Sequence, residues 1–287
     1  MRTRFTLLLP AVALATGMAA CGAGGPSKSA FTKKADASCV AGNTAISSAA
    51  KPTNDPQIAT AAGTAGTTID GQVAALRAMK TPGGNDKKQI DGIIGAIADV
   101  GGPVKALQDA AAKTDDAAMA KAAVDLQAKS DAAATQASAY GLTQCGTALK
   151  PAVANLFDGA KSVVKASFVS KSQALCRDAS RKSDAIAAPG TSAASLGKYF
   201  DAQIAVYTKL VTDLRAVTAP PGDEATVGDL TGAMDALNAK VKEMSTAAKA
   251  NNLKLVAALS DEADVANTAV NAKADAYGLT VCGSVGG

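Results

Sequence analysis

The residue types in this chain limit the chemistry that it could perform. Among its 287 residues there is no His and no Trp, and aromatic residues make up only 3%. Without His, the chain has no Ser–His–Asp or Cys–His nucleophile, no histidine general base and no imidazole ligand for a metal ion. We therefore predict no catalytic residues, no cofactor and no metal site.

Two segments match the Ser-x-x-Lys pattern, in which a lysine can activate a serine nucleophile: Ser162 with Lys165, and Ser195 with Lys198. Penicillin-recognising enzymes combine this pattern with Ser-Asp-Asn and Lys-Thr-Gly elements. The chain contains neither of these elements, and a four-residue pattern often arises by chance. We predict that neither serine is a nucleophile and that a labelled penicillin leaves both unmodified.

Carboxylates cluster at two places, Asp115 with Asp116 and Asp261 with Glu262 and Asp264. A di-metal helical bundle needs inward-facing Glu residues and Glu-x-x-His motifs, which the chain does not have. We interpret both clusters as charges that complement the dipole of a helix start or that cover a solvated face.

The aromatic residues Tyr199, Phe200 and Tyr207 lie close together in the sequence, on one predicted helix. Core packing, with each phenol reaching the surface or a carbonyl, explains such residues. The alternative is an aromatic-lined pocket for a small apolar or ring-bearing ligand, because four-helix bundles can hold ligands between their helices. The sequence is compatible with both interpretations.

The composition predicts helices and gives no sign of a nucleic-acid partner. The chain contains 68 Ala residues, and Ala is the strongest helix former. Lys and Arg are interleaved with Asp and Glu, and the formal net charge is only +4. Nucleic-acid binding needs a clustered basic face, so we expect an all-α protein with a mixed-charge, solvated surface.

Residues 1–20 have the pattern of a secretory signal. Two arginines precede an apolar stretch from Phe5 to Met18, which is shorter than the roughly 20 residues that a membrane-spanning helix needs. The stretch ends in Met18 to Cys21, an apolar residue and two small residues before a cysteine. This ending resembles a bacterial lipobox, although Met18 stands where Leu is usual.

The lipobox resemblance implies that Cys21 carries diacylglycerol and that a peptidase cleaves just before it. Residues 21–30 would then form a lipidated, Gly- and Ser-rich flexible tether, with the membrane as a partner through the lipid on Cys21. Two or three acyl chains hold a protein at a membrane far better than one. Ordinary secretion with an incidental Cys21 is the alternative interpretation.

The other four cysteines reveal a repeat. Cys39 and Cys145 are 106 residues apart, as are Cys176 and Cys282, and the second pair follows the first at an offset of 137. An exported protein meets an oxidising environment, so we predict the disulfides Cys39–Cys145 and Cys176–Cys282. Zinc is the competing interpretation, but the chain lacks both CxxC spacing and His.

The same offset relates Tyr140–Gly146 to Tyr277–Gly283, which share the sequence Tyr-Gly-Leu-Thr-x-Cys-Gly. We predict a tandem duplication of residues 31–146 and 168–283, joined by a linker at 147–167. Each copy is expected to be an antiparallel up-down four-helix bundle closed by one disulfide, since the end of the fourth helix then lies beside the first.

The heptad stripe from Val227 to Ala248 is typical of a helix packed in such a bundle. The first helix of the second copy is predicted over residues 168–187. Gly278 is expected to end the last helix in a left-handed conformation, with Leu279 as its apolar contact. In the first copy, Gly101 to Pro103 interrupt the third helix, where we expect a kink or break.

The lipobox, the Ala-rich helices and the repeated Cys-bearing ending together resemble uncharacterised lipoproteins and small secreted helical proteins of high-GC Gram-positive (actinobacterial) bacteria. The resemblance implies a lipid-anchored protein on the extracytoplasmic face of the cell membrane, and it brings no activity with it. We expect a non-enzymatic protein that binds or scaffolds an envelope protein, glycan or lipid. The alternative is a carrier of a small hydrophobic or aromatic ligand in a bundle pocket.

Overall fold

The computed structural model describes residues 25–284, and these residues form helices without any strand. The predicted all-α fold is therefore confirmed. The predictions for the signal segment and for Cys21 lie outside the described residues. In chain order the helices are α1 (Lys28–Ser47), α2 (Asp55–Arg77), α3 (Asn85–Ala112), α4 (Asp116–Tyr140), α5 (Thr143–Gly146), α6 (Leu149–Asp184), α7 (Ala193–Ala216), α8 (Glu224–Lys249), α9 (Leu253–Tyr277) and the short 3₁₀ helix η1 (Cys282–Ser284).

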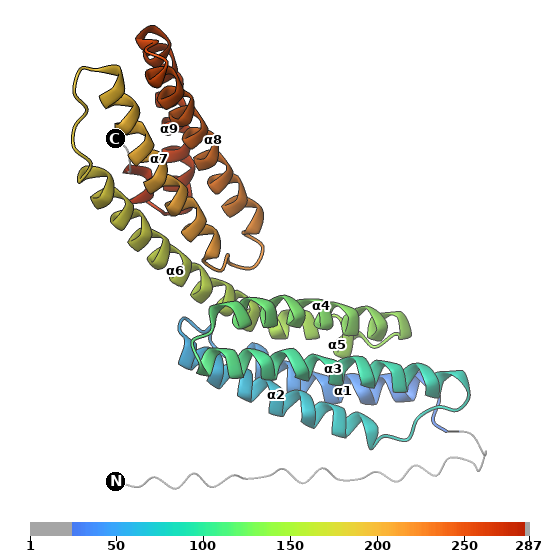
Figure 1. Cartoon of the computed structure of the whole chain (residues 1–287). Helices are drawn as coiled ribbons and strands as arrows, with labels where there is room; N and C mark the ends of the chain where they lie inside the picture. Colours follow the sequence, from blue (N-terminus) through green and yellow to red (C-terminus); the bar gives the residue numbers. More distant parts are fainter. Residues whose placement is uncertain (1–24, 285–287) are drawn as a thin grey trace, which may run out of the picture.

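The first bundle is formed by α1 to α4 and is completed by a further helix, the first half of α6 (Figure 1). This half of α6 packs against both α1 and α4. Leu149, Val153 and Leu156 are among the residues that it buries in the core of the bundle. The first bundle therefore has one continuous core to which α6 belongs.

The prediction that the second copy begins with a helix near Phe168 is wrong, because α6 already begins at Leu149. The residues expected to form a linker at 147–167 are largely helical. They carry apolar residues every three or four positions, which gives a helix one face to bury. Pro151 lies in the first turn of α6, where a missing N–H breaks no helical hydrogen bond.

Two smaller differences concern the first bundle. Helix α3 continues through Pro103, so of the predicted kink or break the break does not occur. The buried stripe of Val100, Val104 and Leu107 holds this helix against its neighbours, and such packing outweighs the cost of one lost hydrogen bond. Residues 28–30, expected in the tether, belong to α1, whose first turn is capped by the Ser27 side chain.

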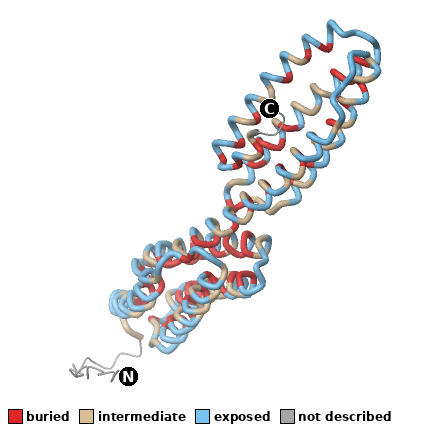
Figure 2. The backbone as a smooth tube through the Cα atoms, turned by 90° about the vertical axis from the view of Figure 1, so that its left-hand side faces the viewer, coloured by how far each residue is buried: buried red, intermediate tan, exposed pale blue. Residues whose placement is uncertain are grey.

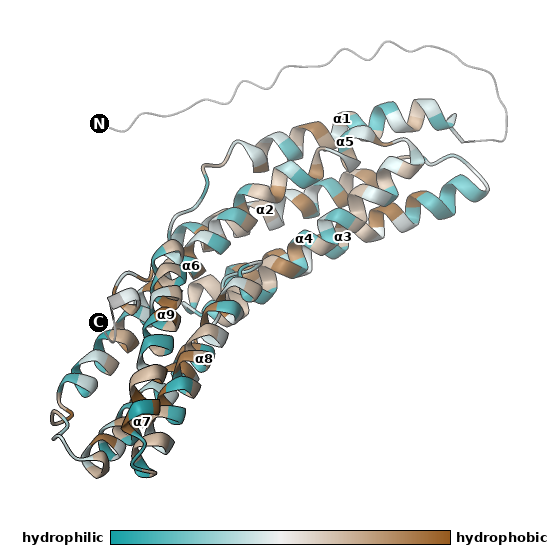
Figure 3. Ribbon diagram, turned by 90° about the horizontal axis from the view of Figure 1, so that it is seen from above, coloured by the Kyte–Doolittle hydropathy of each residue, from teal (hydrophilic) through white to brown (hydrophobic). Residues whose placement is uncertain are grey.

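The second bundle consists of the second half of α6 with α7, α8 and α9. Its buried residues form two separate clusters, one beside the disulfide around Phe168 and Leu214, the other at the far end around Phe200 and Met244. Figure 2 shows buried positions more sparsely along this bundle than within the first. Each helix also carries both hydrophilic and hydrophobic residues, as an amphipathic helix does (Figure 3).

Both predicted disulfides are present. Cys39 in α1 bonds Cys145 in α5, and Cys176 in α6 bonds Cys282 in η1, each pair with its Cα atoms 5.1 Å apart. Each bridge ties a first helix to the segment that follows a fourth helix.

The endings of α4 and α9 are also built alike. Gly141 and Gly278 have φ angles of 98° and 91°, and the next residue, Leu142 or Leu279, donates its N–H back into the last turn. This is the left-handed helix ending predicted for Gly278.

Matching ring contacts lie beside these endings. Phe31 meets Tyr140 edge-on with ring centroids 6.4 Å apart, and Phe168 meets Tyr277 at 5.7 Å. A lysine, Lys28 or Lys165, lies over each tyrosine ring. All of these pairs repeat at the offset of 137.

The two bundles lie at an angle to each other and are joined by α6, which runs through both (Figure 1). A helix of 36 residues is about 54 Å long. Helix α1 begins at the end of the first bundle that points away from the second (Figures 1 and 2). Within residues 25–284, every helix is too short or too polar to cross a membrane.

Candidate functional site

A groove of about 520 Å³ opens at the far end of the second bundle. The end of α6, α7 as far as Tyr207, the second half of α8 and α9 as far as Asn267 line it. Tyr199, Phe200 and Tyr207 all line this groove. The structure thus brings the three residues of the predicted aromatic pocket to one place.

The three rings line the groove at different depths. Tyr199 and Phe200 meet edge-on, with centroids 5.7 Å apart. Phe200 is only 8% exposed and packs with Met244 in the distal core cluster. Tyr207 is half-buried, and this burial raises the pKa of its phenol. The Tyr207 phenol therefore stays neutral and presents both ring surface and a hydroxyl group.

A short hydrogen-bonded chain orients the polar wall. Ser183 at the end of α6 donates to Gln203 Oε1 over 2.8 Å, and Gln203 Nε2 donates to the hydroxyl of Tyr199 over 3.1 Å. Because the Tyr199 oxygen accepts this bond, its own proton can be donated to another group. These hydrogen bonds also link α6 to α7 across the groove.

The floor and the rim of the groove differ in character. Leu237, Val241 and Met244 from α8 form an apolar floor, whereas the carboxylates of Asp184 and Asp264 lie at the exposed rim. We missed Asp184 from the sequence and interpreted Asp264 only as a surface charge. Neither has a neighbour in the sequence that marks it as part of a site.

Comparing the two bundles, with the burial in the first bundle known, explains the groove. At the offset of 137, Ser183 stands where the first bundle has Ile46, and Ala263 stands where it has Leu126. Ile46 and Leu126 are 4% and 0% exposed. The second bundle therefore has smaller or polar side chains where the first bundle has large apolar ones, which leaves space between α6 and α9.

A further difference is the covering helix. One flank of α4 is buried in the first bundle, where α6 packs against it. The corresponding flank of α9 is not buried in the second bundle. The α4 flank consists of Ala120, Ala123, Ser130 and Ala134. Its counterparts at the offset of 137 are Ala257, Ser260, Asn267 and Asn271, all of them exposed or half-buried. Ser260 and Asn267 line the groove, so it occupies the position that α6 fills in the first bundle.

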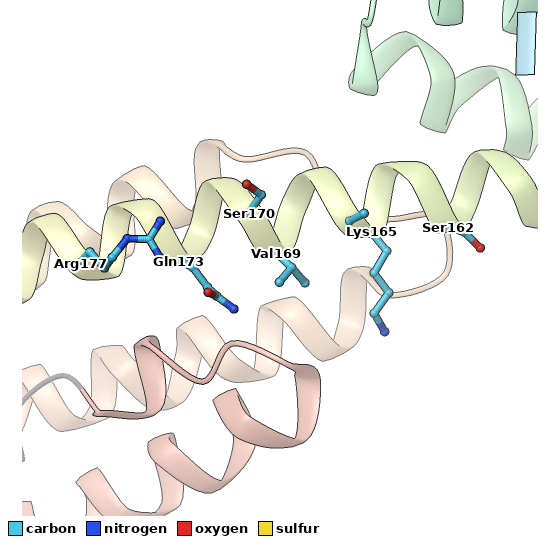
Figure 4. A pocket seen from close by; sticks show the side chains of 7 residues that line it. Ser162, Lys165, Val169, Ser170, Gln173 and Arg177 are labelled. Carbon is cyan, nitrogen blue, oxygen red and sulfur yellow. The ribbon is translucent and has the colours of Figure 1, made fainter. Parts of the chain in front are cut away.

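A second hollow, of about 670 Å³, follows the middle of α6 and contains Ser162 and Lys165 (Figure 4). All of its lining residues come from α6 itself, so it has one wall only. Ser162 donates its hydroxyl to the carbonyl of Asp158 at 2.7 Å. Lys165 instead lies 3.5 Å from the carboxylate of Asp223 and over the Tyr277 ring.

The other residues with candidate chemistry have structural contacts. Ser195 Oγ accepts a hydrogen bond from the Gly190 N–H at 2.6 Å. Asp115 caps the start of α4, as expected of a helix-start charge, and Asp116 next to it pairs with Lys171 of α6. In the part of the chain that the structure describes, no three His, Cys, Asp or Glu side chains are grouped to hold a metal ion.

A polar cluster holds α6 to the base of the second bundle. Asp223 lies 3.1 Å from Lys161 Nζ, and Tyr277 donates its hydroxyl to Asp223 over 2.9 Å. Burial alone would raise the pKa of Asp223, but the hydrogen bonds from Tyr277 and Lys161 hold it below its usual value. The same burial and the bond to Asp223 raise the pKa of Tyr277.

The groove of the second bundle therefore combines an aromatic wall, an apolar floor and a polar rim, whereas the hollow on α6 has one wall. We take the groove as the candidate binding site. Comparison of the chain with models of protein families, with curated proteins and with solved structures found no match.

Proposed function

We propose that the protein is a non-enzymatic binding protein, anchored by lipid on Cys21 to the extracytoplasmic face of the cell membrane, which carries a small ring-bearing ligand in the groove of the second bundle. The observation that supports this most directly is the difference between the bundles. The position that α6 fills in the first bundle is an open, aromatic-lined groove in the second. Its volume of about 520 Å³ is within the usual range of ligand pockets.

We further propose that the two bundles arose by tandem duplication of a four-helix unit. The matching disulfides, left-handed helix endings and edge-on aromatic pairs support this, because each recurs at the offset of 137. In this proposal the first copy, closed by α6, serves as a rigid support. The second copy has kept the space that α6 closes in the first and uses it for binding.

The arrangement of the molecule fits a tethered binding protein. Helix α1 follows the proposed tether and begins at one end of the molecule, whereas the groove lies at the opposite end (Figure 1). A lipid on Cys21 would therefore hold the first bundle near the membrane. The groove would face away from the anchor, where a ligand can reach it.

The anchor can be tested separately from the groove. Cells that express the full chain or its Cys21→Ser variant are fed an alkyne-bearing fatty acid and then fractionated. We expect label and membrane association for the original chain and the loss of both for the variant. Equal labelling of the two chains would contradict lipidation at Cys21.

The groove can be tested with a photo-crosslinking amino acid in place of Ser260, which lines it. The matched control carries the crosslinker at Val124, an exposed position on the first bundle. After irradiation in cells, we expect a small added mass on the chain modified at 260. The adduct should disappear when Ala263→Leu, which copies Leu126 of the first bundle, fills the groove. No adduct at 260, or equal adducts at both positions, would contradict the proposal.

A second candidate function is supported by the covering helix of the first bundle. The first half of α6 lies between α1 and α4 there, so a helix from a partner protein could occupy the corresponding groove in the second bundle. In the same crosslinking experiment, a protein-sized adduct at position 260 that Ala263→Leu removes would favour this scaffold function over the carrier.

A further inference from the structure

The charged residues that line the groove are both acidic. Asp184 and Asp264 lie at its rim, and none of its lining residues is Lys or Arg. Within residues 25–284, neither of these two aspartates forms an ion pair of 4 Å or less, whereas Arg181 and Lys182 on the same stretch of α6 both pair with Asp178. Among the described residues, the groove therefore presents two carboxylates that form no ion pair with a basic side chain.

The aromatic wall also favours a positively charged ligand. The faces of aromatic rings carry partial negative charge and attract cations within about 6 Å of the ring centre, more strongly where water is excluded. Tyr199, Phe200 and Tyr207 line the groove together, and Asp184 is near enough to Tyr207 to act on its phenol electrostatically. An anionic ligand would meet two carboxylates and no basic side chain.

We propose that the groove binds a small organic cation, an alkylated ammonium group carried on an apolar or ring-bearing body. The ammonium group lies between the tyrosine rings and the rim carboxylates of Asp184 and Asp264. The apolar body rests on the floor formed by Leu237, Val241 and Met244. This inference rests on the proposed carrier function and names the class of ligand. Alkylated ammonium suits the site because it is attracted by ring faces and carboxylates and needs no hydrogen-bond acceptor of its own.

The test compares ligands of equal shape and different charge. The full chain is titrated with benzyltrimethylammonium, with its uncharged isostere neopentylbenzene, and with phenylacetate, by calorimetry at low salt. Tyrosine fluorescence is a second signal, because the chain has no Trp. We expect the cation to bind at least about tenfold more tightly than the isostere, the anion not to bind, and cation affinity to fall as salt is added.

Variants locate the effect. Asp264→Asn and Asp184→Asn should each weaken cation binding about three- to tenfold and leave the isostere unchanged. Asp261→Asn is the matched control, because Asp261 is exposed on α9 but does not line the groove. Ala263→Leu should abolish the binding of both ligands, and circular dichroism confirms that each variant is folded.

The outcomes separate this inference from the function on which it rests. Equal affinity for cation and isostere, both lost in Ala263→Leu, would overturn the cation preference and leave the carrier function standing. Binding of neither probe would also overturn it, and the crosslinking at position 260 would then decide the carrier function separately. Cation binding that survives Asp264→Asn, Asp184→Asn and Ala263→Leu would place the cation elsewhere and overturn the inference.

Discussion

At the scale of single residues, a glycine directly follows the second cysteine of each disulfide and packs closely against a helix. A Cβ atom on Gly283 would lie 3.2 Å from the carbonyl oxygen of Asn271, and one on Gly146 would lie 3.0 Å from that of Ala134. These two contacts again match at the offset of 137. The absence of a side chain therefore lets the segment after each disulfide pack against the last turns of a fourth helix.

We predict that Gly283→Ala destabilises the protein by about 1–3 kcal/mol, because the added methyl group has no space. Gly232→Ala is the control: Gly232 is an exposed residue of α8 with nothing within 4 Å of an added Cβ. That change should stabilise the helix by about 0.5–1 kcal/mol. Denaturant unfolding of both variants measures the two effects, and equal stabilities would contradict the close packing at Gly283.

The lowered pKa of Asp223 makes the base of the second bundle sensitive to acid. A carboxylate whose pKa is lower in the folded state stabilises the protein at pH values above its unfolded pKa, near 4, and this stabilisation is lost as the pH falls through the folded pKa. Lys161, Lys165 and Tyr277 face this carboxylate.

We therefore predict that Asp223→Asn lowers the melting temperature at pH 7 and that the difference from the original chain shrinks below about pH 4. Thermal unfolding at a series of pH values measures this difference. Asp229→Asn, an exposed change on α8, is the control that should show no such trend. A constant difference between pH 7 and pH 2 would show that Asp223 stabilises without its charge.

At the scale of elements, α6 is the helix that sequence patterns described least well. Its second half was predicted because it carries Cys176 and repeats the pattern of α1. The sequence repeat has no counterpart for the first half of α6 and therefore predicts a linker there. The apolar positions Leu149, Val153 and Leu156 show the helical spacing, but only the gap between α1 and α4 reveals what they cover.

We predict that Leu156→Ala, which removes a buried side chain of α6, costs about 2–5 kcal/mol. The loss of stability should be confined to the first bundle. Hydrogen exchange should show faster exchange in residues 149–160 and in α1 and α4, with α8 and α9 unchanged. Val124→Ala, at an exposed position, should change the stability by less than about 0.5 kcal/mol. Equal loosening of both bundles would contradict this division.

The groove shows a similar limit of sequence analysis. The aromatic trio could be recognised because its residues lie on one helix. Asp184, Asp264 and Gln203 could not, because their meeting depends on how α6, α7 and α9 are spaced. That spacing follows from the lack of a covering helix on the second bundle. A comparison of the two repeats reveals this lack only when the structure of the first bundle is known.

At the scale of the whole molecule, the disulfides secure two bundles with different cores. The first bundle has one large core, whereas the second has two smaller clusters, and Cys176 and Cys282 belong to one of these. Both pairings could be predicted because the cysteines repeat at a fixed offset. The angle between the bundles could not, since it depends on the continuity of α6.

We predict that replacing Cys176 and Cys282 by Ser lowers the melting temperature of the second bundle by about 10–20 °C, since closing a loop of about 100 residues stabilises by about 4–5 kcal/mol. The matched double variant at Cys39 and Cys145 should have the smaller effect, because the first core is larger. Calorimetry of the two variants makes the comparison. Unchanged melting in both would contradict a stabilising role for the bridges.

The continuity of α6 also fixes the orientation of one bundle relative to the other. Each residue of an α-helix turns the chain by about 100°, so the number of residues between the bundles sets the direction in which the groove opens around the axis of α6. One residue removed between Ser162 and Ser167 would rotate the groove by more than a quarter turn relative to the first bundle. Inserting seven residues there would bring it back nearly to its original direction. The length of α6 thus fixes the direction in which the groove opens relative to the first bundle.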